Sequence, residues 1–500
     1  MSFCMWKLLV VSFLFSLVLA SLALAQWSEP VRISVNQDAF EPRGVAVGET
    51  LHVVVSRGLA QFEYIKSTDN GITWMDPVMP ADTFNLAAHD PDIVFSNRKL
   101  HIAWIGQIHG NPRGQIFHMS SSNGGRTWSN PHQVYNNDSA MLKYPKLAAG
   151  GRNLYLACRT ERQLLVFRST NSGVSWQDSV AVENGPITID QWETFLYSDS
   201  VLHLIYSFNL ATDSLGTEIC YRNSHDNGHT WSDRIYLSTP EPTPNNKNGI
   251  YPSAYADSLG NIVALWCDFK NGSTCGGWYG EILGRISTDN GSNWQPEFAI
   301  TDHETGLNSS CIFIGGRLCA AWEDDSYILC RPKITVSMST NQGNSWDLPQ
   351  MISGPDTADD MAPMLFVSKA NNDITLHCIF WRYHYPDSGG LFYMRNDNLS
   401  AISNDENHIL PTEMKLAGYP NPFNSGINIS FSNPEGGDIA ITIYDILGRK
   451  IREYNLRDAK EGNIKWDASD AMGNKVSSGI YFAKASASHS SFVLKMILIK

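Results

Sequence analysis

The chain has 500 residues, enough for two to four ordinary domains. Its 37 Lys and Arg stand against 50 Asp and Glu, and a net charge of −13 without any basic run argues against a nucleic-acid-binding protein. With 43% hydrophobic residues, the composition excludes a wholly disordered chain. The 15 Trp and 38 Gly, at only 17% charged residues, call for a structural cause.

Residues 1–25 have the pattern of a secretory signal peptide. Lys7 precedes an apolar run from Leu8, and Ala23-Leu24-Ala25 supplies small residues before the expected cleavage site. The run is also about long enough to cross a membrane, so an uncleaved anchor is the alternative. No later stretch is long and apolar enough to span, so we expect no transmembrane helix after cleavage.

An octapeptide with Ser first, Asp or Asn third, Gly fifth and Trp last recurs six times. An Asp or Asn side chain bonds to backbone further along a turn, Gly permits a positive φ, and Trp packs its ring on a sheet. The copies end at Trp74, Trp128, Trp176, Trp231, Trp294 and Trp346.

Short apolar runs recur seven times, once more than the octapeptides, and each is typical of a buried strand. Trp27–Ser34 matches the residues that follow an octapeptide and so supplies the missing outer strand. Seven four-stranded sheets then form a ring in which the two chain ends share one sheet. The runs are Leu51–Val55, Leu100–Trp104, Leu154–Cys158, Leu202–Tyr206, Ile262–Trp266, Leu318–Trp322 and Leu376–Phe380.

The octapeptide resembles the Asp-box, or bacterial neuraminidase (BNR), repeat, which joins the outer two strands of β-propeller blades. The resemblance covers residues 27 to about 397. We therefore predict an all-β protein in which residues 26–397 form a seven-bladed β-propeller. Six blades, the number in sialidases of this repeat family, are the alternative.

A second domain follows a polar linker at 398–410. Alternating apolar residues and Gly/Asn turns over 411–500 predict a small Ig-like β-sandwich. The motifs Tyr419–Asn424 (YPNPFN), Ile443–Arg449 (IYDILGR) and Ser478–Phe482 (SGIYF) resemble the type A C-terminal sorting domain of the type IX secretion system. The resemblance implies a bacterial protein that is secreted or held on the cell surface, with the secretion machinery as the partner of residues 411–500. An accessory Ig-like module is the alternative.

The cysteines and histidines do not have metal-ligand spacing, so no metal and no cofactor is predicted. Cys267 and Cys275 flank a polar loop and are the best candidate for a disulfide, whereas most other cysteines fall in apolar strand patterns. The His residues of the recurring Leu-His pairs are predicted to pack within the fold.

The innermost strands align on a recurring x-Pro pair, and residues that flank the Pro lie on one face. On this alignment the first four sheets gather polar groups at one side of a central channel, and the last three offer small or apolar ones. The alternative is that these groups only bond to one another around a wet channel. The aligned x residues are Glu41, Asp90, Tyr144, Trp192, Tyr251, Ser309 and Ala362.

Candidate roles follow from the chemistry of these side chains. An acid and a base or nucleophile beside one bond hydrolyse a glycoside, and Arg pairs clamp carboxylates. The candidate catalytic residues are Asp90, Asp92, Tyr144 and Glu193. The candidate substrate-binding residues are Arg43, Arg57, Lys146, Arg159, Trp192 and Arg382.

The family resemblance implies an Arg triad on the substrate carboxylate, a Tyr nucleophile supported by Glu, and an Asp acid/base. Arg43 is roughly in place, but the Arg-Ile-Pro motif is absent, and no Asp occurs at 58–65 after Arg57. Tyr144 and Tyr251 both remain candidates for the nucleophile. Two functions therefore stay open: an extracellular propeller that binds glycans or protein partners at the channel mouth, and a sialidase-like glycoside hydrolase.

Overall fold

The computed structural model divides the chain into two compact units, Met1–Asn404 and Asp405–Lys500. The predicted signal peptide at 1–25 and the predicted linker at 398–410 lie outside the described residues. The structure describes residues 27–499 except 35–38, 59–60, 82–86, 108–113, 137–139, 161, 185–192, 210–216, 240–248, 271–278, 302–303, 315, 327–330, 371–372, 385–388, 398–414, 420–422, 424–425, 433–437, 458, 460 and 487–490.

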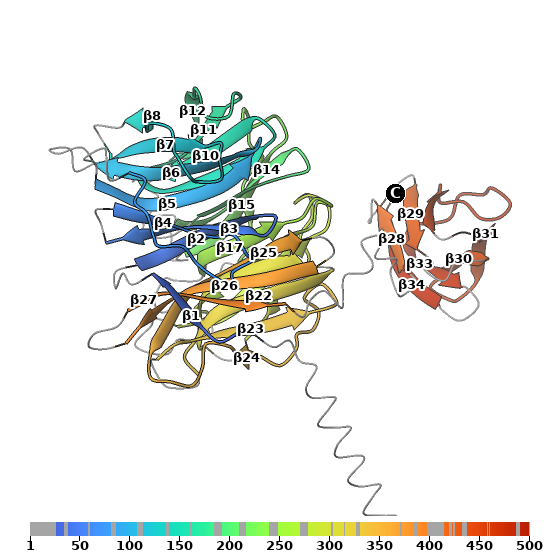
Figure 1. Ribbon diagram of the computed structural model, residues 1–500. Helices are drawn as coiled ribbons and strands as arrows, with labels where there is room; N and C mark the ends of the chain where they lie inside the picture. The colour runs from blue at the N-terminus through green and yellow to red at the C-terminus, as the bar shows by residue number, and fades with distance from the viewer. Residues whose placement is uncertain are drawn as a thin grey trace, which may run out of the picture. The chain divides into compact units, whose positions relative to one another are not determined.

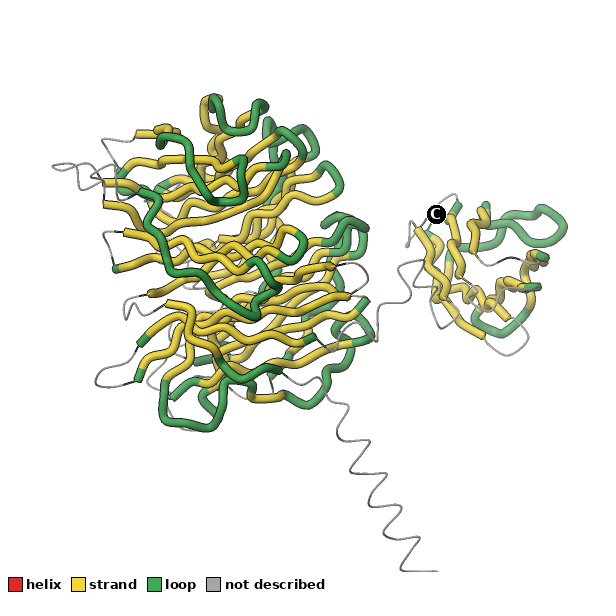
Figure 2. The backbone as a smooth tube through the Cα atoms, viewed as in Figure 1, coloured by secondary structure: helices red, strands yellow, loops and turns green. Residues whose placement is uncertain are grey.

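The described residues form strands and turns and no helix, as Figure 2 shows, so the all-β prediction is confirmed. A search of these residues accordingly finds no helix able to cross a membrane. In the first unit, the strands form seven antiparallel sheets (Figure 1).

Three of these sheets come from the first part of the unit. Within each, consecutive strands pair with their neighbours in the sequence, as expected for hairpin-connected strands. They are β2 (Ala39–Val47), β3 (Thr50–Arg57), β4 (Gln61–Ser67); β5 (Ala87–Ser96), β6 (Lys99–Gln107), β7 (Gln115–Ser121), β8 (His132–Asn136); and β9 (Lys143–Gly150), β10 (Asn153–Arg159), β11 (Gln163–Ser169), β12 (Gln177–Asn184).

The next three sheets repeat this pattern. They are β13 (Glu193–Ser198), β14 (Val201–Asn209), β15 (Thr217–Ser224), β16 (Ile235–Tyr236); β17 (Gly249–Ala256), β18 (Ile262–Asp268), β19 (Glu281–Ser287), β20 (Phe298–Ala299); and β21 (Gly306–Ile314), β22 (Arg317–Asp324), β23 (Lys333–Ser339), β24 (Gln350–Met351).

The seventh sheet joins the two ends of the unit. Strands β25 (Asp359–Ala370), β26 (Asp373–Tyr383) and β27 (Gly390–Asn396) are consecutive, and β1 (Val31–Ser34) pairs antiparallel with β27. The register sets Val31 opposite Tyr393. The first strand of each sheet contacts the first strand of the next, and β25 contacts β2, so the innermost strands form a closed ring.

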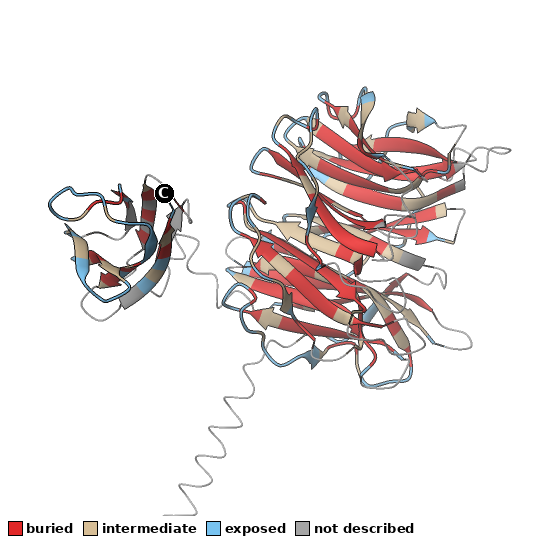
Figure 3. Cartoon of the chain, turned by 180° about the vertical axis from the view of Figure 1, so that it is seen from behind, coloured by how far each residue is buried: buried red, intermediate tan, exposed pale blue. Residues whose placement is uncertain are grey.

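Hydrophobic cores lie between neighbouring sheets. Trp104, Trp266 and Trp322, which end the apolar runs of second strands, are fully buried. Figure 3 shows buried residues running along the inner strands while exposed residues gather at the turns. Each sheet is covered on both faces by its neighbours, and the apolar runs in the sequence reflect this burial.

The Asp boxes tie adjacent sheets together. In the box at 67–74, the Gly71 N–H donates to Ser67 Oγ at 2.9 Å, and the Thr73 N–H donates to Asp69 Oδ1 at 2.9 Å. Trp74 packs against Tyr393 of β27, with ring centroids 4.8 Å apart. The box of one sheet therefore rests on the third strand of its neighbour.

The recurring His residues are buried and bonded within the fold, so the predicted packing role is confirmed. His52 Nδ1 is 2.7 Å from the hydroxyl oxygen of Tyr64, and His377 Nδ1 is 2.8 Å from that of Tyr393. Burial lowers the pKa of His52 to about 4, so the imidazole is neutral.

The cysteines of the strands are buried. Cys158, Cys220, Cys311, Cys319 and Cys378 are free thiols, as the strand patterns predict. The thiol of Cys267 donates to the carbonyl oxygen of Gly306 at 3.2 Å, and Cys275 lies outside the described residues. Disulfide formation between Cys267 and Cys275 therefore stays a prediction.

The second unit consists of two antiparallel sheets around one core. The core includes Ile427, Ile441, Ile464 and Ala483 from both sheets, together with the fully buried Trp466. One sheet contains β28 (Lys415–Tyr419), β29 (Ile427–Ser432) and β32 (Glu461–Trp466). The other contains β30 (Ile439–Asp445), β31 (Lys450–Leu456), β33 (Gly479–Ser486) and β34 (Ser491–Leu498).

Candidate functional site

A bulge recurs in the first strands of the sheets. The pairing of β2 with β3 slips between Phe40 and Arg43, and β5, β17, β21 and β25 slip at the corresponding place. Such a bulge re-aims side chains and is frequent beside functional sites. The residue at the bulge has a left-handed φ of 42° to 57° in Glu41, Asp90, Tyr144, Tyr251, Asn308 and Ala362.

This position is the x-Pro site that the sequence alignment singled out. The alignment is wrong by one residue in β21, because Asn308 takes the bulge position and Ser309 takes the place of the Pro. Trp192, the corresponding residue before β13, lies outside the described residues. Its neighbour Glu193 begins β13 with regular pairing to Tyr206.

The first strands enclose a cavity of about 930 Å³. Every one of the seven sheets contributes to its wall, as expected for the centre of a closed ring. Lining residues from the successive first strands include Arg43, Asp92, Lys146, Glu193, Ser253, Ser310 and Met364.

One side of the wall carries opposite charges. Arg43 Nε lies 3.9 Å from Asp92 Oδ1, and Asp92 Oδ2 accepts a hydrogen bond of 2.6 Å from the backbone N–H of Leu147. Asp92 thus joins β5 to β9 as well as facing the cavity. Lys146 is buried beside them, and burial lowers its pKa.

Glu41 is an acid that titrates near neutral pH. Burial raises its pKa from 4.5 to about 7, an effect that the positive charges of Lys146 and Arg43 only partly oppose. The side chain lines the cavity from the bulge of β2. Near pH 7 the carboxyl group therefore exists in both protonation states.

Glu193, which lines the cavity, pairs with Arg159. Arg159 Nε is 2.7 Å from Glu193 Oε2, and the side chains are 1% and 0% exposed. Arg159 Nη2 also donates to the carbonyl oxygen of Ser207 at 3.1 Å. Burial raises the pKa of Glu193, while Arg159 opposes the rise. Arg159 is thus engaged with Glu193 and Ser207, and it is not among the residues that line the cavity.

The part of the wall formed by the last three sheets offers aromatic and further polar groups. Tyr251, Tyr279 and Trp381 line it, together with Asn308 and Glu323. Glu323 is 1% exposed, and burial raises its pKa from 4.5 to about 7. Burial also raises the pKa of Tyr279, so its phenol stays protonated.

The sequence indicates only part of this wall: Glu323, at the end of a second strand, is expected near the channel mouth but receives no role. The expectation that the last three sheets offer mostly small or apolar groups does not hold for Glu323, Asn308 and Tyr279. A signal for Glu323 was present, because it directly follows the apolar run Leu318–Trp322. Tyr279 follows the predicted polar loop, and the sequence contains no signal that it turns inward.

Three further candidates are not among the residues that line the cavity. Asp90 is at the bulge of β5, and its carboxylate Oδ2 is 3.2 Å from His89 Nδ1. Tyr144 occupies the bulge of β9. Arg57 ends β3 with its side chain 45% exposed and 3.8 Å from Glu63. The structure therefore does not bring these side chains together with Arg43 and Asp92 in the cavity wall.

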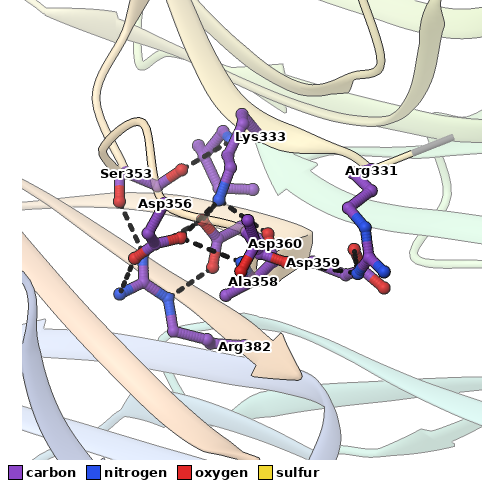
Figure 4. A network of polar contacts seen from close by, with 10 residues as sticks. Arg331, Lys333, Ser353, Asp356, Ala358, Asp359, Asp360 and Arg382 are labelled. Atoms are coloured by element: carbon purple, nitrogen blue, oxygen red, sulfur yellow. Dashed lines mark hydrogen bonds and ion pairs between the residues drawn. The ribbon is translucent and has the colours of Figure 1, made fainter. Parts of the chain in front are cut away.

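Arg382 belongs to a separate polar network, shown in Figure 4. Arg382 Nε donates to Asp360 Oδ1 at 2.6 Å, and Lys333 Nζ donates to Asp356 Oδ1 at the same distance. Lys333 and Asp360 are fully buried. The guanidinium is thus held by carboxylates of its own chain. Among the described residues, no group of His, Cys, Asp and Glu side chains is arranged to hold a metal ion.

Protein family models match part of each unit. Residues 21–262 match the BNR repeat-like domain, and residues 417–500 match the secretion system C-terminal sorting domain. The two resemblances read from the sequence are thereby confirmed. No curated protein matches the chain.

Solved structures resemble this chain at low sequence identity. A polysaccharide lyase of family PL25, an ulvan lyase bound to -[GlcA(1-4)Rha3S]-, is 12% identical with a TM-score of 0.54, over 73% of this chain and 95% of the lyase. An α-L-arabinanase from Penicillium chrysogenum, complexed with arabinobiose, is 12% identical with a TM-score of 0.48, over 75% and 99%. A protein of unknown function from Dyadobacter fermentans is 14% identical with a TM-score of 0.44, over 62% and 95%.

Proposed function

We propose that this chain, which combines a BNR repeat-like propeller domain with a secretion system C-terminal sorting domain, binds an extracellular glycan in its central cavity. The sorting domain indicates type IX secretion, so the protein is secreted or displayed on the cell surface. Polymers outside the cell are therefore the molecules that its cavity meets.

The observation that carries the proposal is the cavity itself. Its volume of about 930 Å³ lies within the usual range for small-molecule sites. One side offers Arg43, Asp92 and Lys146 for hydrogen bonds, and the other offers the rings of Tyr251 and Trp381. Sugars present both hydroxyl groups and apolar ring faces, so a wall of this mixed kind suits them.

We further infer the finer architecture from the sheets. The seven sheets of the first unit are read as seven propeller blades, with the domain running over 26–397. The two-sheet unit is read as the predicted Ig-like sandwich over 411–500. The sorting domain then serves export, and ligand binding belongs to the propeller.

A binding panel tests the proposal. The mature chain would be titrated calorimetrically with ulvan oligosaccharides, arabinobiose, lactose and 3′-sialyllactose. Arg43→Met removes an accessible donor of the wall while keeping side-chain length, and affinity should fall about tenfold or more. Arg126→Ala, at an exposed turn of an Asp box, should bind as the wild type does.

Two results would count against the proposal. The first is a mature chain that binds no member of the panel. The second is an Arg43→Met variant whose affinity equals that of the wild type and of Arg126→Ala. A protein ligand at the same channel mouth would then be the remaining interpretation.

A glycoside hydrolase is the second candidate, and one observation favours it. Glu41 and Glu323 are carboxyl groups of one cavity with pKa values near 7, as a general acid requires. A sialic-acid clamp is less suited to the site, because Arg159 pairs with Glu193 and Arg382 pairs with Asp360. Release of dye from fluorogenic glycosides, lost in Asp92→Asn, would establish hydrolysis and replace the proposal of binding without catalysis.

A further inference from the structure

We propose that Glu323 determines specificity in the cavity by donating a hydrogen bond from its protonated carboxyl group to an oxygen of the bound saccharide. This inference rests on the proposed function and adds the chemistry of the part of the wall to which β22 contributes. It concerns a residue whose carboxyl group is buried, lines the cavity and has its two oxygens in different surroundings.

One oxygen of Glu323 is fixed by two donors. Asn308 Nδ2 donates to Oε1 at 2.6 Å, and the backbone N–H of Ala362 donates to the same atom at 2.7 Å. Both donors come from bulge positions, in β21 and β25, where the left-handed backbone aims them at β22. The rotation of the carboxyl group is thereby set.

The other oxygen faces the cavity. No described residue donates a hydrogen bond to Oε2. This atom is also not among the fully enclosed atoms without a partner, so it is accessible from the cavity. Because Oε1 already accepts two hydrogen bonds, a proton on this carboxyl group resides on Oε2. The protonated side chain is therefore a donor directed at whatever occupies the cavity.

The surroundings favour the protonated form. Burial raises the pKa of Glu323, although the bonds from Asn308 and Ala362 act in the opposite direction. The titratable group that interacts with it electrostatically is Tyr279, which also faces Asp325 and Asp359 and stays neutral. On the adjacent strands β23 and β25, Lys333 and Asp360 pair with each other 3.3 Å apart.

A neutral acid and its anion treat a sugar differently. The acid donates to ring and hydroxyl oxygens, whereas the carboxylate can only accept. Binding that depends on this donor is thus strongest below pH 7 and is lost as the pH rises through the pKa of Glu323. Glu41 of the same cavity titrates in the same range, so the two residues must be separated by substitution.

Uncharged sugars isolate this effect, because arabinobiose and lactose have no group that titrates between pH 5 and pH 9. Their affinity for the wild type should fall about tenfold between pH 6 and pH 8.5. Glu323→Gln keeps an oxygen for Asn308 and Ala362 and a permanent N–H donor toward the cavity. This variant should keep its affinity across the range, whereas Glu41→Gln should still show the fall.

A ligand-free measurement separates this inference from the proposed function. Carboxyl ¹³C labelling of glutamate, with the signal assigned by its loss in Glu323→Gln, should give a titration midpoint near 7. A midpoint near 4.5, or a Glu323→Gln variant whose affinity falls with pH as in the wild type, would overturn the donor role.

Failure of every sugar to bind would instead overturn the proposed function, and with it the donor role. In that case, a midpoint near 7 would still establish the neutral acid. Thermal unfolding at pH 6 checks that the variants are folded.

Discussion

Glu41 and Glu323 both line one cavity, and burial raises the pKa of each to about 7. The pKa of Lys146, beside Glu41, is lowered instead, because burial disfavours the charged form of the lysine. The protonation state of these single residues is thus set by their removal from water. The pairs Arg159–Glu193 and Arg382–Asp360 show the other outcome, in which buried charges compensate each other.

The pH dependence of stability tests the burial of Glu323. Its pKa is higher in the folded chain than in the unfolded chain, so its favourable contribution is complete below pH 4.5 and is lost as the pH rises to about 7. Glu323→Gln removes the cost of ionisation and should stabilise the protein by roughly 1–3 kcal/mol at pH 8, with little change at pH 5. Chemical unfolding at both pH values measures this difference. The exposed Glu29→Gln is the control, and an equal gain at both pH values would contradict the prediction.

At the scale of the elements, the Asp box works through close approach. Gly125 has φ +78°, and a Cβ atom there would lie 1.9 Å from the hydroxyl oxygen of Tyr64 in the neighbouring sheet. Trp128 of the same box packs edge-on against Tyr64, with ring centroids 5.2 Å apart. The fifth-position glycine is therefore required for sheet-to-sheet contact as well as for the turn.

Adjacent glycines of this box provide a matched test. Gly125→Ala should destabilise the protein by roughly 3 kcal/mol or more, because the methyl group displaces Tyr64 in addition to straining the backbone. Gly124→Ala also has a positive φ, but its Cβ would meet only Lys66 Nζ at 4.0 Å. Gly124→Ala should therefore lower the free energy of unfolding by only about 1 kcal/mol. If urea unfolding shows that both variants lose the same free energy of unfolding, the close approach to Tyr64 contributes nothing to stability.

At the scale of the whole first unit, the ring depends on a strand from far away in the sequence. Pairing of β1 with β27 joins residues some 360 positions apart and completes the seventh sheet. Ile33 of β1 is buried in the same core as Leu391 and Tyr393. Without β1, the outer edge of β27 and part of this core would be open to water.

Deletion of residues 27–34 should therefore lower the midpoint of thermal unfolding by several degrees and weaken ligand binding in the cavity. Deletion of 411–500 is the control, because that unit has its own core and should leave the unfolding of the first unit unchanged. Calorimetry on both truncated chains gives the answer. A first unit that unfolds at the same temperature without β1 would contradict a role of this strand in closure.

The sequence by itself determined the repeating parts of this protein. Box turns, buried strands and the x-Pro positions arise from short patterns, and the outer strand within Trp27–Ser34 is identified because it matches the residues after each box. The sorting motifs from Tyr419 onward were equally specific. Local periodicity sufficed because every repeat buries the same positions against its neighbours.

Only the tertiary structure decided which polar groups meet. One wall contains Arg43, Asp92 and Lys146, as expected. The ion pair between Arg382 and Asp360, by contrast, depends on packing that no local pattern encodes. Glu323 became a candidate because donors from two other strands orient its carboxyl group. Such contacts join residues tens of positions apart, and their chemistry follows from burial in the assembled ring.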